Sequence, residues 1–296
     1  MKKTAAIVIV FVCVAIILYI WVLNQQTSKL YVNSQLLYAV VGTYKGKSAQ
    51  GMAIWKNKAC LFNNGGHCRI LNLQTGIVER EFNLGSSGEN MHVATACFGK
   101  TKMPDSEFPL LYVAEFTGKS RCFVESINGS NISNVVQVIE AKERGKNYRI
   151  QCWLVDSTDN SIYSVSGESQ VDSVGNCPVI VRKYRLPLIS EGKEILLTEK
   201  DKQVQFKLNF ANCLQGAAIR HGYMYIATGF QASQHLSPRG QRTLKIIDLE
   251  KKKITKEIDL THLTTNEPEG FDFYGNQALV FCGQEGGIYQ INIDNK

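Results

Sequence analysis

The chain has 296 residues, enough for one large all-β domain with an appendage or for two small domains. Its formal charge is +7, of which Lys2 and Lys3 supply two, so the remaining excess is spread thinly over a large body. Clustered basic residues interleaved with aromatics are absent, which argues against a nucleic-acid partner.

The N-terminus predicts a membrane anchor. Residues 5–23 form an unbroken apolar run, which as a helix would be about 28 Å long, close to the thickness of a hydrocarbon core. Tyr19 and Trp21 lie toward its far end, as interfacial aromatics do. Because Lys2 and Lys3 precede the run, residues 1–4 are expected in the cytoplasm and the body outside it. We expect a single-pass inner-membrane protein whose body lies in the periplasm or at the cell exterior.

A cleaved signal peptide is the alternative for this segment. Its apolar region would be shorter, about 7–15 residues, and a small-x-small site would follow. Asn24 to Ser28 contain no clear site of that kind, so an uncleaved anchor is favoured. Residues 24–34 then form a polar spacer and residues 35–296 the folded domain. Both alternatives place this domain outside the cytoplasm.

The cysteines leave two alternatives open. Apart from Cys13, the exported body would carry eight: Cys60, Cys68, Cys97, Cys122, Cys152, Cys177, Cys213 and Cys282. An even number in an oxidising compartment permits disulfides. However, no C-x-x-C occurs, and several cysteines lie in apolar runs where a thiol packs as a small apolar residue. Mostly free, buried thiols are favoured, and no spacing predicts a zinc site.

Apolar and polar residues alternate along the domain with the period of a β-strand. The first predicted strands are Leu36 to Tyr44, Gly51 to Trp55 and Lys58 to Phe62, and the Asn63–Gly66 turn carries the Asn-Gly signal of a hairpin. A hairpin at residues 70–84 recurs at residues 244–260. No long amphipathic helix follows residue 23.

A short repeat sets the architecture. Gln50-Gly51, Gln215-Gly216 and Glu269-Gly270 each precede an apolar strand, and a turn and a further strand follow each one. Repeats of this kind indicate radially packed sheets, because a single twisted four-stranded sheet cannot bury both of its faces alone. The sequence therefore predicts an all-β fold, a β-propeller.

About five blades are expected, spanning residues 50–84, 92–140, 148–208, 215–260 and 269–293. The third span is long enough that six blades are the alternative. The fifth blade lacks one strand, which the segment Leu36 to Tyr44 can supply. Such pairing of the two chain ends closes the ring and leaves no exposed edge.

The repeat also predicts a site. Innermost strands line the central channel, so residues at their starts converge on one mouth: Gln50, His92 (or its neighbour Asn90), Gln215 and Glu269. Amide, imidazole and carboxyl groups around one axis suit a hydroxylated ligand or a hard cation such as calcium. The alternative is structural, since Gln-Gly or Glu-Gly at a strand start can simply satisfy backbone groups in a tight turn.

Glu269 is the most informative single residue. Pro268 stiffens the approach to it and Gly270 allows close packing behind it, so the carboxylate could bind calcium or act as a base. Asp272 is a candidate partner acid. The motifs G-x-S-x-G, Walker A and H-E-x-x-H do not occur, and no complete catalytic set is found.

Two resemblances follow from these motifs. The Glu-Pro-Glu-Gly-Phe element at residues 267–271, the Gln-Gly strand starts and the block from Met91 to Val113 resemble exported β-propeller proteins of Bacteroides-type bacteria. That group is distantly similar to the propellers of phage receptor-binding and teichoic-acid-related proteins. The Pro-Glu-Gly element is also similar to calcium-dependent lactonase and gluconolactonase propellers, which implies a calcium role for Glu269. The equivalent blade starts here carry Gln50 and Gln215, which removes negative charge from the site.

The sequence therefore leaves two competing predictions of function. The first is a membrane-anchored, extracytoplasmic propeller that binds a glycan, an envelope polymer or a protein at its central face, without a resident cofactor. The second is a calcium-dependent, lactonase-like hydrolase centred on Glu269. A purely structural role is a third alternative.

Overall fold

The computed structural model describes residues 30–31, 34–38, 49–116, 120–130, 132–143, 146–147, 149–167, 176–211, 214–229, 241–261, 263, 266–283 and 287–293. Apart from one 3-10 turn, η1 (Ile189–Glu191), every regular element in these ranges is a β-strand. The predicted anchor at residues 5–23 lies outside them. Within them, no helix is long and apolar enough to cross a membrane.

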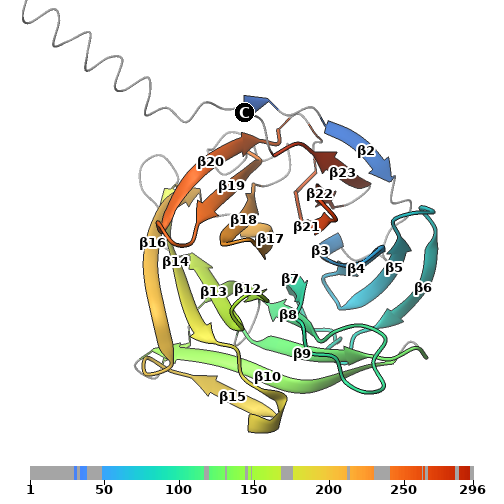
Figure 1. The fold of residues 1–296 in the computed structure, drawn as a ribbon, viewed down its shortest axis with the longest axis vertical. Coiled ribbons are helices and arrows are strands. Elements are labelled where there is room, and N and C mark those ends of the chain that lie inside the picture. The colour runs from blue at the N-terminus through green and yellow to red at the C-terminus, as the bar shows by residue number, and fades with distance from the viewer. Residues whose placement is uncertain are drawn as a thin grey trace, which may run out of the picture.

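The strands form five antiparallel blades arranged around a hub (Figure 1). Blade 1 contains, from the hub outward, β3 (Ala49–Trp55), β4 (Lys58–Asn63), β5 (His67–Asn72) and β6 (Val78–Asn83). Blade 2 contains β7 (Val93–Phe98), β8 (Leu111–Glu115), β9 (Cys122–Ile127) and β10 (Ser133–Glu143), with β11 (Lys146–Asn147) beside β10. Blade 3 contains β12 (Ile150–Asp156), β13 (Ser161–Gly167), β14 (Asn176–Arg185) and β16 (Lys202–Ala211).

The last two blades include strands from the start of the chain. Blade 4 contains β17 (Leu214–Arg220), β18 (Tyr223–Thr228), β19 (Thr243–Asp248) and β20 (Lys253–Asp259). Blade 5 contains β21 (Gly270–Tyr274), β22 (Gln277–Cys282), β23 (Gly287–Ile291) and, outermost, β2 (Ser34–Tyr38). The pairing of β2 with β23 confirms the predicted closure of the ring. One addition was not predicted: β1 (Leu30–Tyr31) pairs in parallel with β20.

Apolar cores lie between the blades, one in each of the five wedges. Each is a separate cluster of buried side chains from two neighbouring sheets. Large members of the five clusters are Phe108, Trp153, Met224, Phe271 and Phe281. The innermost strands β3, β7, β12, β17 and β21 contact one another in ring order. Burial of both faces of each sheet against its neighbours is the physical reason why the repeat folds as a ring.

Glycines allow the inner strands of blades 4, 5 and 1 to approach closely. A Cβ atom on Gly216 would lie 2.3 Å from the carbonyl carbon of Gly270. A Cβ atom on Gly270 would lie 2.6 Å from Cβ of Met52 in the next blade. These glycines belong to the Gln-Gly and Glu-Gly repeat, so the repeat is partly a requirement of hub packing.

A segment between β14 and β16 joins blades 2 and 3. The alternative prediction placed an additional blade in this part of the chain. It contains η1 and β15 (Glu194–Leu197), which pairs in parallel with β10 of blade 2. The amide of Gln137 donates to the backbone carbonyls of Leu188 and Gly192, at 3.0 and 2.8 Å. The six-blade alternative is therefore wrong, because the extra length of the third span crosses back to the preceding sheet.

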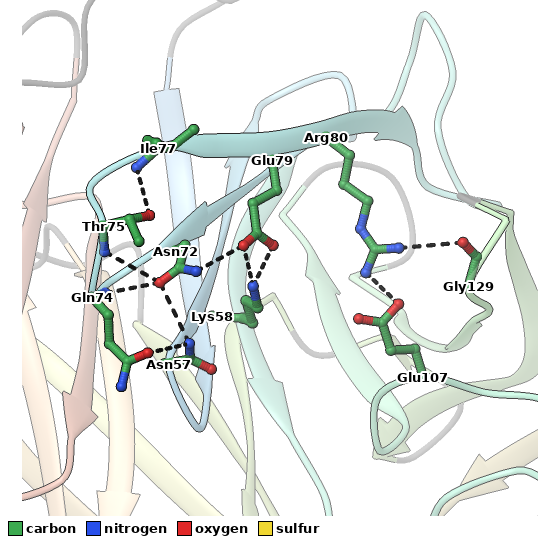
Figure 2. Close-up of polar contacts among 10 residues, drawn as sticks. All are labelled: Asn57, Lys58, Asn72, Gln74, Thr75, Ile77, Glu79, Arg80, Glu107 and Gly129. Atoms are coloured by element: carbon green, nitrogen blue, oxygen red, sulfur yellow. Dashed lines mark hydrogen bonds and ion pairs between the residues drawn. The ribbon is translucent and has the colours of Figure 1, made fainter.

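The exposed outer edge of blade 1 is held by polar contacts (Figure 2). Glu79 on β6 pairs with Lys58 and accepts a hydrogen bond from the Asn72 amide at 2.7 Å. Arg80 pairs with Glu107 of blade 2 and donates to the carbonyl of Gly129 at 3.4 Å. The same strand thus connects its own sheet to the next one.

Six cysteines in the described ranges are free thiols, in agreement with the favoured expectation: Cys60, Cys68, Cys97, Cys122, Cys152 and Cys282. Five are buried and Cys97 is partly buried. Burial raises the pKa of Cys97 and of Cys152 to about 12, so both stay protonated and act as apolar residues at neutral pH.

Candidate functional site

The repeated Gln-Gly and Glu-Gly elements lie where the inner strands begin. Gln50 is the second residue of β3 and Gln215 the second residue of β17, while Glu269 immediately precedes β21. The register of β3 shifts between Gln50 and Met52, and that of β17 shifts between Leu214 and Ala217. Bulges at these positions re-aim the side chains at the strand starts.

Blades 1 and 5 meet through two of the predicted residues. The Gln50 amide Nε2 donates to Oε1 of Glu269 at 3.1 Å. Only 8% of Gln50 and 4% of Glu269 are exposed, so this contact is inside the hub and away from bulk water. A buried polar pair of this kind must have its hydrogen bonds satisfied to be stable.

Blade 4 joins through a residue that the sequence did not single out. The Gln215 amide Nε2 donates to Oε2 of Glu267 at 3.0 Å and to the carbonyl of Gly229 at 3.3 Å. The backbone carbonyl of Glu267 accepts from the N–H groups of Glu269 and Gly283, at 3.0 and 2.9 Å. These bonds fix the Glu-Pro-Glu turn and bring the two glutamate side chains together.

The Glu267 and Glu269 carboxyls form a pair at the centre of this set. No donor in the described ranges reaches Oε2 of Glu269, and the Glu267 carboxyl lies in hydrogen-bonding contact with Glu269. Burial, and then the neighbouring Glu267 carboxylate, raise the pKa of Glu269 well above its ordinary value, while the Gln50 amide opposes the shift. Both effects favour the protonated form of Glu269 beside Glu267.

The four residues Gln50, Glu269, Glu267 and Gln215 are called the hub set below. They come from blades 1, 5 and 4 and form one chain of polar contacts. Glu267 is partly exposed whereas Glu269 lies behind it. A ligand arriving from solvent would meet Glu267 before Glu269.

Asp272 is not the partner acid of Glu269. Its Oδ2 accepts the backbone N–H of Ile54 at 2.6 Å, and its Oδ1 accepts that of Phe273 at 2.8 Å. The side chain therefore joins β21 to β3 of the next blade. Burial raises the pKa of Asp272 to about 7, with the two backbone N–H groups acting in the opposite direction.

His92 packs differently from the hub set. Its ring meets the ring of Phe116 edge-on, with centroids 5.6 Å apart, and its carbonyl accepts the Phe116 N–H at 2.9 Å. The guanidinium of Arg149 also lies over the Phe116 ring, 5.4 Å from its centroid. Burial lowers the pKa of His92, so the imidazole is neutral at pH 7. No contact found in the described ranges joins His92 to the hub set.

The hub set does not form a calcium cage as it stands. Calcium takes six to eight oxygen ligands. Both amides of the set direct N–H groups, not oxygens, at the carboxyls. In the described ranges, no three His, Cys, Asp or Glu side chains gather in a way that could hold a metal ion.

Solved structures share the fold. The chain is similar to the crystal structure of Myxococcus xanthus glutaminyl cyclase, with a TM-score of 0.52 and 10% identity over 90% of this chain and 98% of that one. It is also similar to the β-propeller domain of Cps50 (Swd1) from Myceliophteria thermophila, with a TM-score of 0.41 and 11% identity over 83% and 84% of the two chains. At such identities the first likeness shows the fold alone.

Comparison with protein-family models and with curated proteins finds no match. The solved structure therefore supports the predicted β-propeller fold and no closer relationship. The resemblances to Bacteroides-type exported proteins, to phage-related propellers and to lactonases stay predictions.

Proposed function

We propose that the chain is a membrane-anchored, extracytoplasmic propeller that binds a glycan, an envelope polymer or a protein ligand at the mouth of its hub. The observation that carries this proposal is the hub set, in which side chains from three blades gather into one hydrogen-bonded chain. Amides and carboxyls in a partly dry setting recognise hydroxyl and amide groups by geometry. The anchor would be residues 5–23.

The carboxyl pair supports binding rather than glycoside cleavage. Glycosidases place their two carboxyls about 5–9.5 Å apart to admit the sugar or a water between them. Here the two carboxyls touch, and Glu269 is buried behind Glu267. A glycan at this mouth would therefore be held by Glu267 and the amides without being cut by the pair.

The test is ligand binding by the full chain in detergent, screened on glycan and envelope-polymer arrays. Gln50→Ala and Gln215→Ala each remove one amide of the hub set and should weaken binding of the captured ligand at least tenfold. Gln74→Ala, at an exposed turn of blade 1, is the matched control and should bind as the wild type does. Each variant is checked for a cooperative thermal transition. Unchanged binding by both folded hub variants would refute the proposal.

Two enzymatic alternatives are tested with the same preparation. A calcium-dependent, lactonase-like activity centred on Glu269 requires a calcium-driven rise in melting temperature that Glu269→Gln abolishes. Since a similar structure is a glutaminyl cyclase, an N-terminal glutaminyl peptide is also assayed. Turnover in either assay would replace the binding proposal with an enzymatic one.

A further inference from the structure

We propose that a cavity between blades 2 and 3, toward the face of the ring opposite the hub set, binds a small uncharged molecule. Such a ligand has an aromatic or similarly apolar body and one oxygen that hydrogen-bonds the hydroxyl of Tyr112. It would be additional to any ligand at the mouth of the hub.

The cavity has a volume of about 560 Å³, within the range of about 300–1,000 Å³ that is usual for small-molecule sites. It lies beside the ends of β7 and β12, whereas the hub set lies where the inner strands begin. Its lining comes from the loop between β7 and β8, from β8, from the turn after β12 and from the segment after β14. The lining residues are Thr101, Met103, Leu110, Tyr112, Asn160 and the run 185–190.

Apolar side chains form most of the lining. Met103 and Leu110 contribute from blade 2, and the residues from Leu186 to Ile189 contribute from the segment after β14. Leu110 is fully buried, whereas Leu188 is 60% exposed. An apolar ligand that covers Leu188 would remove this surface from water, which favours binding.

The phenol of Tyr112 is the polar group that selects the ligand. Tyr112 is only 2% exposed, and within the described ranges no hydrogen bond to its hydroxyl is found. Burial, and then the thiols of Cys122 and Cys97, raise its pKa, with no contribution from a hydrogen bond. A Cβ atom on Gly99 would lie 2.8 Å from Cε2 of the ring, so the ring packs closely against this glycine. Because a buried tyrosine hydroxyl usually has a partner, a ligand oxygen would supply the one that is missing.

The charges around the cavity favour an uncharged ligand. Arg185 is the one charged residue among those that line it, and its Nη1 and Nη2 donate to the two carboxylate oxygens of Glu191 at 2.7 and 2.8 Å. Glu191 also accepts the N–H of Leu188 at 3.0 Å, so this pair holds the segment in place. An anionic ligand would have to displace Glu191, and a cationic one would find no acid in the lining.

The experiment is a titration with para-fluorophenol of the full chain in detergent, labelled with carbon-13 in its methionine methyl groups and observed by NMR. Met103 lines the cavity, whereas Met224 is fully buried in the core between blades 3 and 4. We expect the Met103 methyl signal, assigned with Met103→Leu, to shift saturably while that of Met224 stays in place. A blank titration of detergent micelles measures how much probe they take up.

Two probes and two variants test the hydrogen bond. Fluorobenzene has the ring of para-fluorophenol without its hydroxyl. Tyr112→Phe should weaken binding of para-fluorophenol about fivefold and leave that of fluorobenzene unchanged, because only the first probe loses a hydrogen bond. Tyr223→Phe removes the same hydroxyl group at an exposed position of blade 4, and this matched control should bind both probes as the wild type does.

Further probes separate the alternatives. The anion para-fluorobenzoate and the cation para-fluorobenzylammonium should each bind at least tenfold more weakly than para-fluorophenol. Absence of a saturable Met103 shift, an equal effect of Tyr112→Phe on both neutral probes, or tighter binding of either charged probe would each overturn the proposal. Gln50→Ala and Gln215→Ala should bind para-fluorophenol normally, so failure here leaves the proposed function of the hub untouched.

Discussion

Gly216→Ala tests whether inner strands of neighbouring blades meet as closely as the ring requires. The added Cβ atom would lie 2.3 Å from the carbonyl carbon, 2.5 Å from the Cα of Gly270 and 2.5 Å from the amide nitrogen of Phe271. All three are backbone atoms in the first residues of β21, so no side-chain rotation relieves the clash. Overpacking of this kind costs about 1–3 kcal/mol, and the stiffness of the hub favours the upper end of that range.

The assay is equilibrium denaturation with urea or guanidinium of the full chain in a non-denaturing detergent. Gly88→Ala is the matched control, because Gly88 is exposed and no atom lies within 4 Å of the position that its new Cβ would take. Because alanine has less backbone freedom than glycine in the unfolded chain, this substitution should leave the free energy of unfolding unchanged or raise it by up to about 1 kcal/mol. Equal midpoints for the two variants would show that blades 4 and 5 do not approach at Gly216, and the reasoning on hub packing would fail.

The remaining predictions concern the carboxyls of Asp272 and Glu125. The folded pKa of Asp272, about 7, lies above the unfolded value of about 3.9, so the folded state holds this proton more tightly and stability falls as pH rises from about 4 to about 7. The folding free energy lost across that range is on the order of 4 kcal/mol. Asp272→Asn should remove this pH dependence from melting curves while weakening one backbone contact, such as that to Ile54. A variant with the wild-type slope would contradict this assignment. Glu125 is fully buried and accepts the N–H groups of Gly85 and Ser86 at 2.7 and 3.0 Å, so Glu125→Gln should cost about 2 kcal/mol in urea denaturation. A loss below about 0.5 kcal/mol would show that these bonds do not hold the loop.

The ring itself was predictable because its causes are local and repeated. Alternation of apolar residues indicates strands, and the Gly that follows Gln215 or Glu269 marks the point where two inner strands touch. The closing strand could be placed because blade 5 is one strand short. The segment that contains β15 could not, since it pairs with a strand about fifty residues earlier and has no repeat to align with.

Three of the four hub-set residues could be expected near one another from the repeat, whereas two details depend on packing between strands. Glu267 precedes Pro268 in a segment that the sequence indicates is a loop, so it was not selected as a site residue. The Glu-Pro-Glu element was still a usable signal, because its proline stiffens the turn between two acids. His92 occupies a blade start by chain order, but packing against Phe116 decides where its ring lies. Sequence order locates a strand start, whereas side-chain direction depends on neighbours from other strands.

The central claim is that the buried Glu269 carboxyl lies against that of Glu267, between amides from two other blades, and that burial and this contact raise the pKa of Glu269. Carbon-13 NMR titration of the glutamate carboxyls in the full chain measures this directly, with Glu267→Gln and Glu269→Gln used for assignment. We expect the pKa of Glu269 to lie well above its ordinary value, and Glu267→Gln to lower it. Titration of Glu269 near the ordinary glutamate value of about 4.3 would contradict the claim.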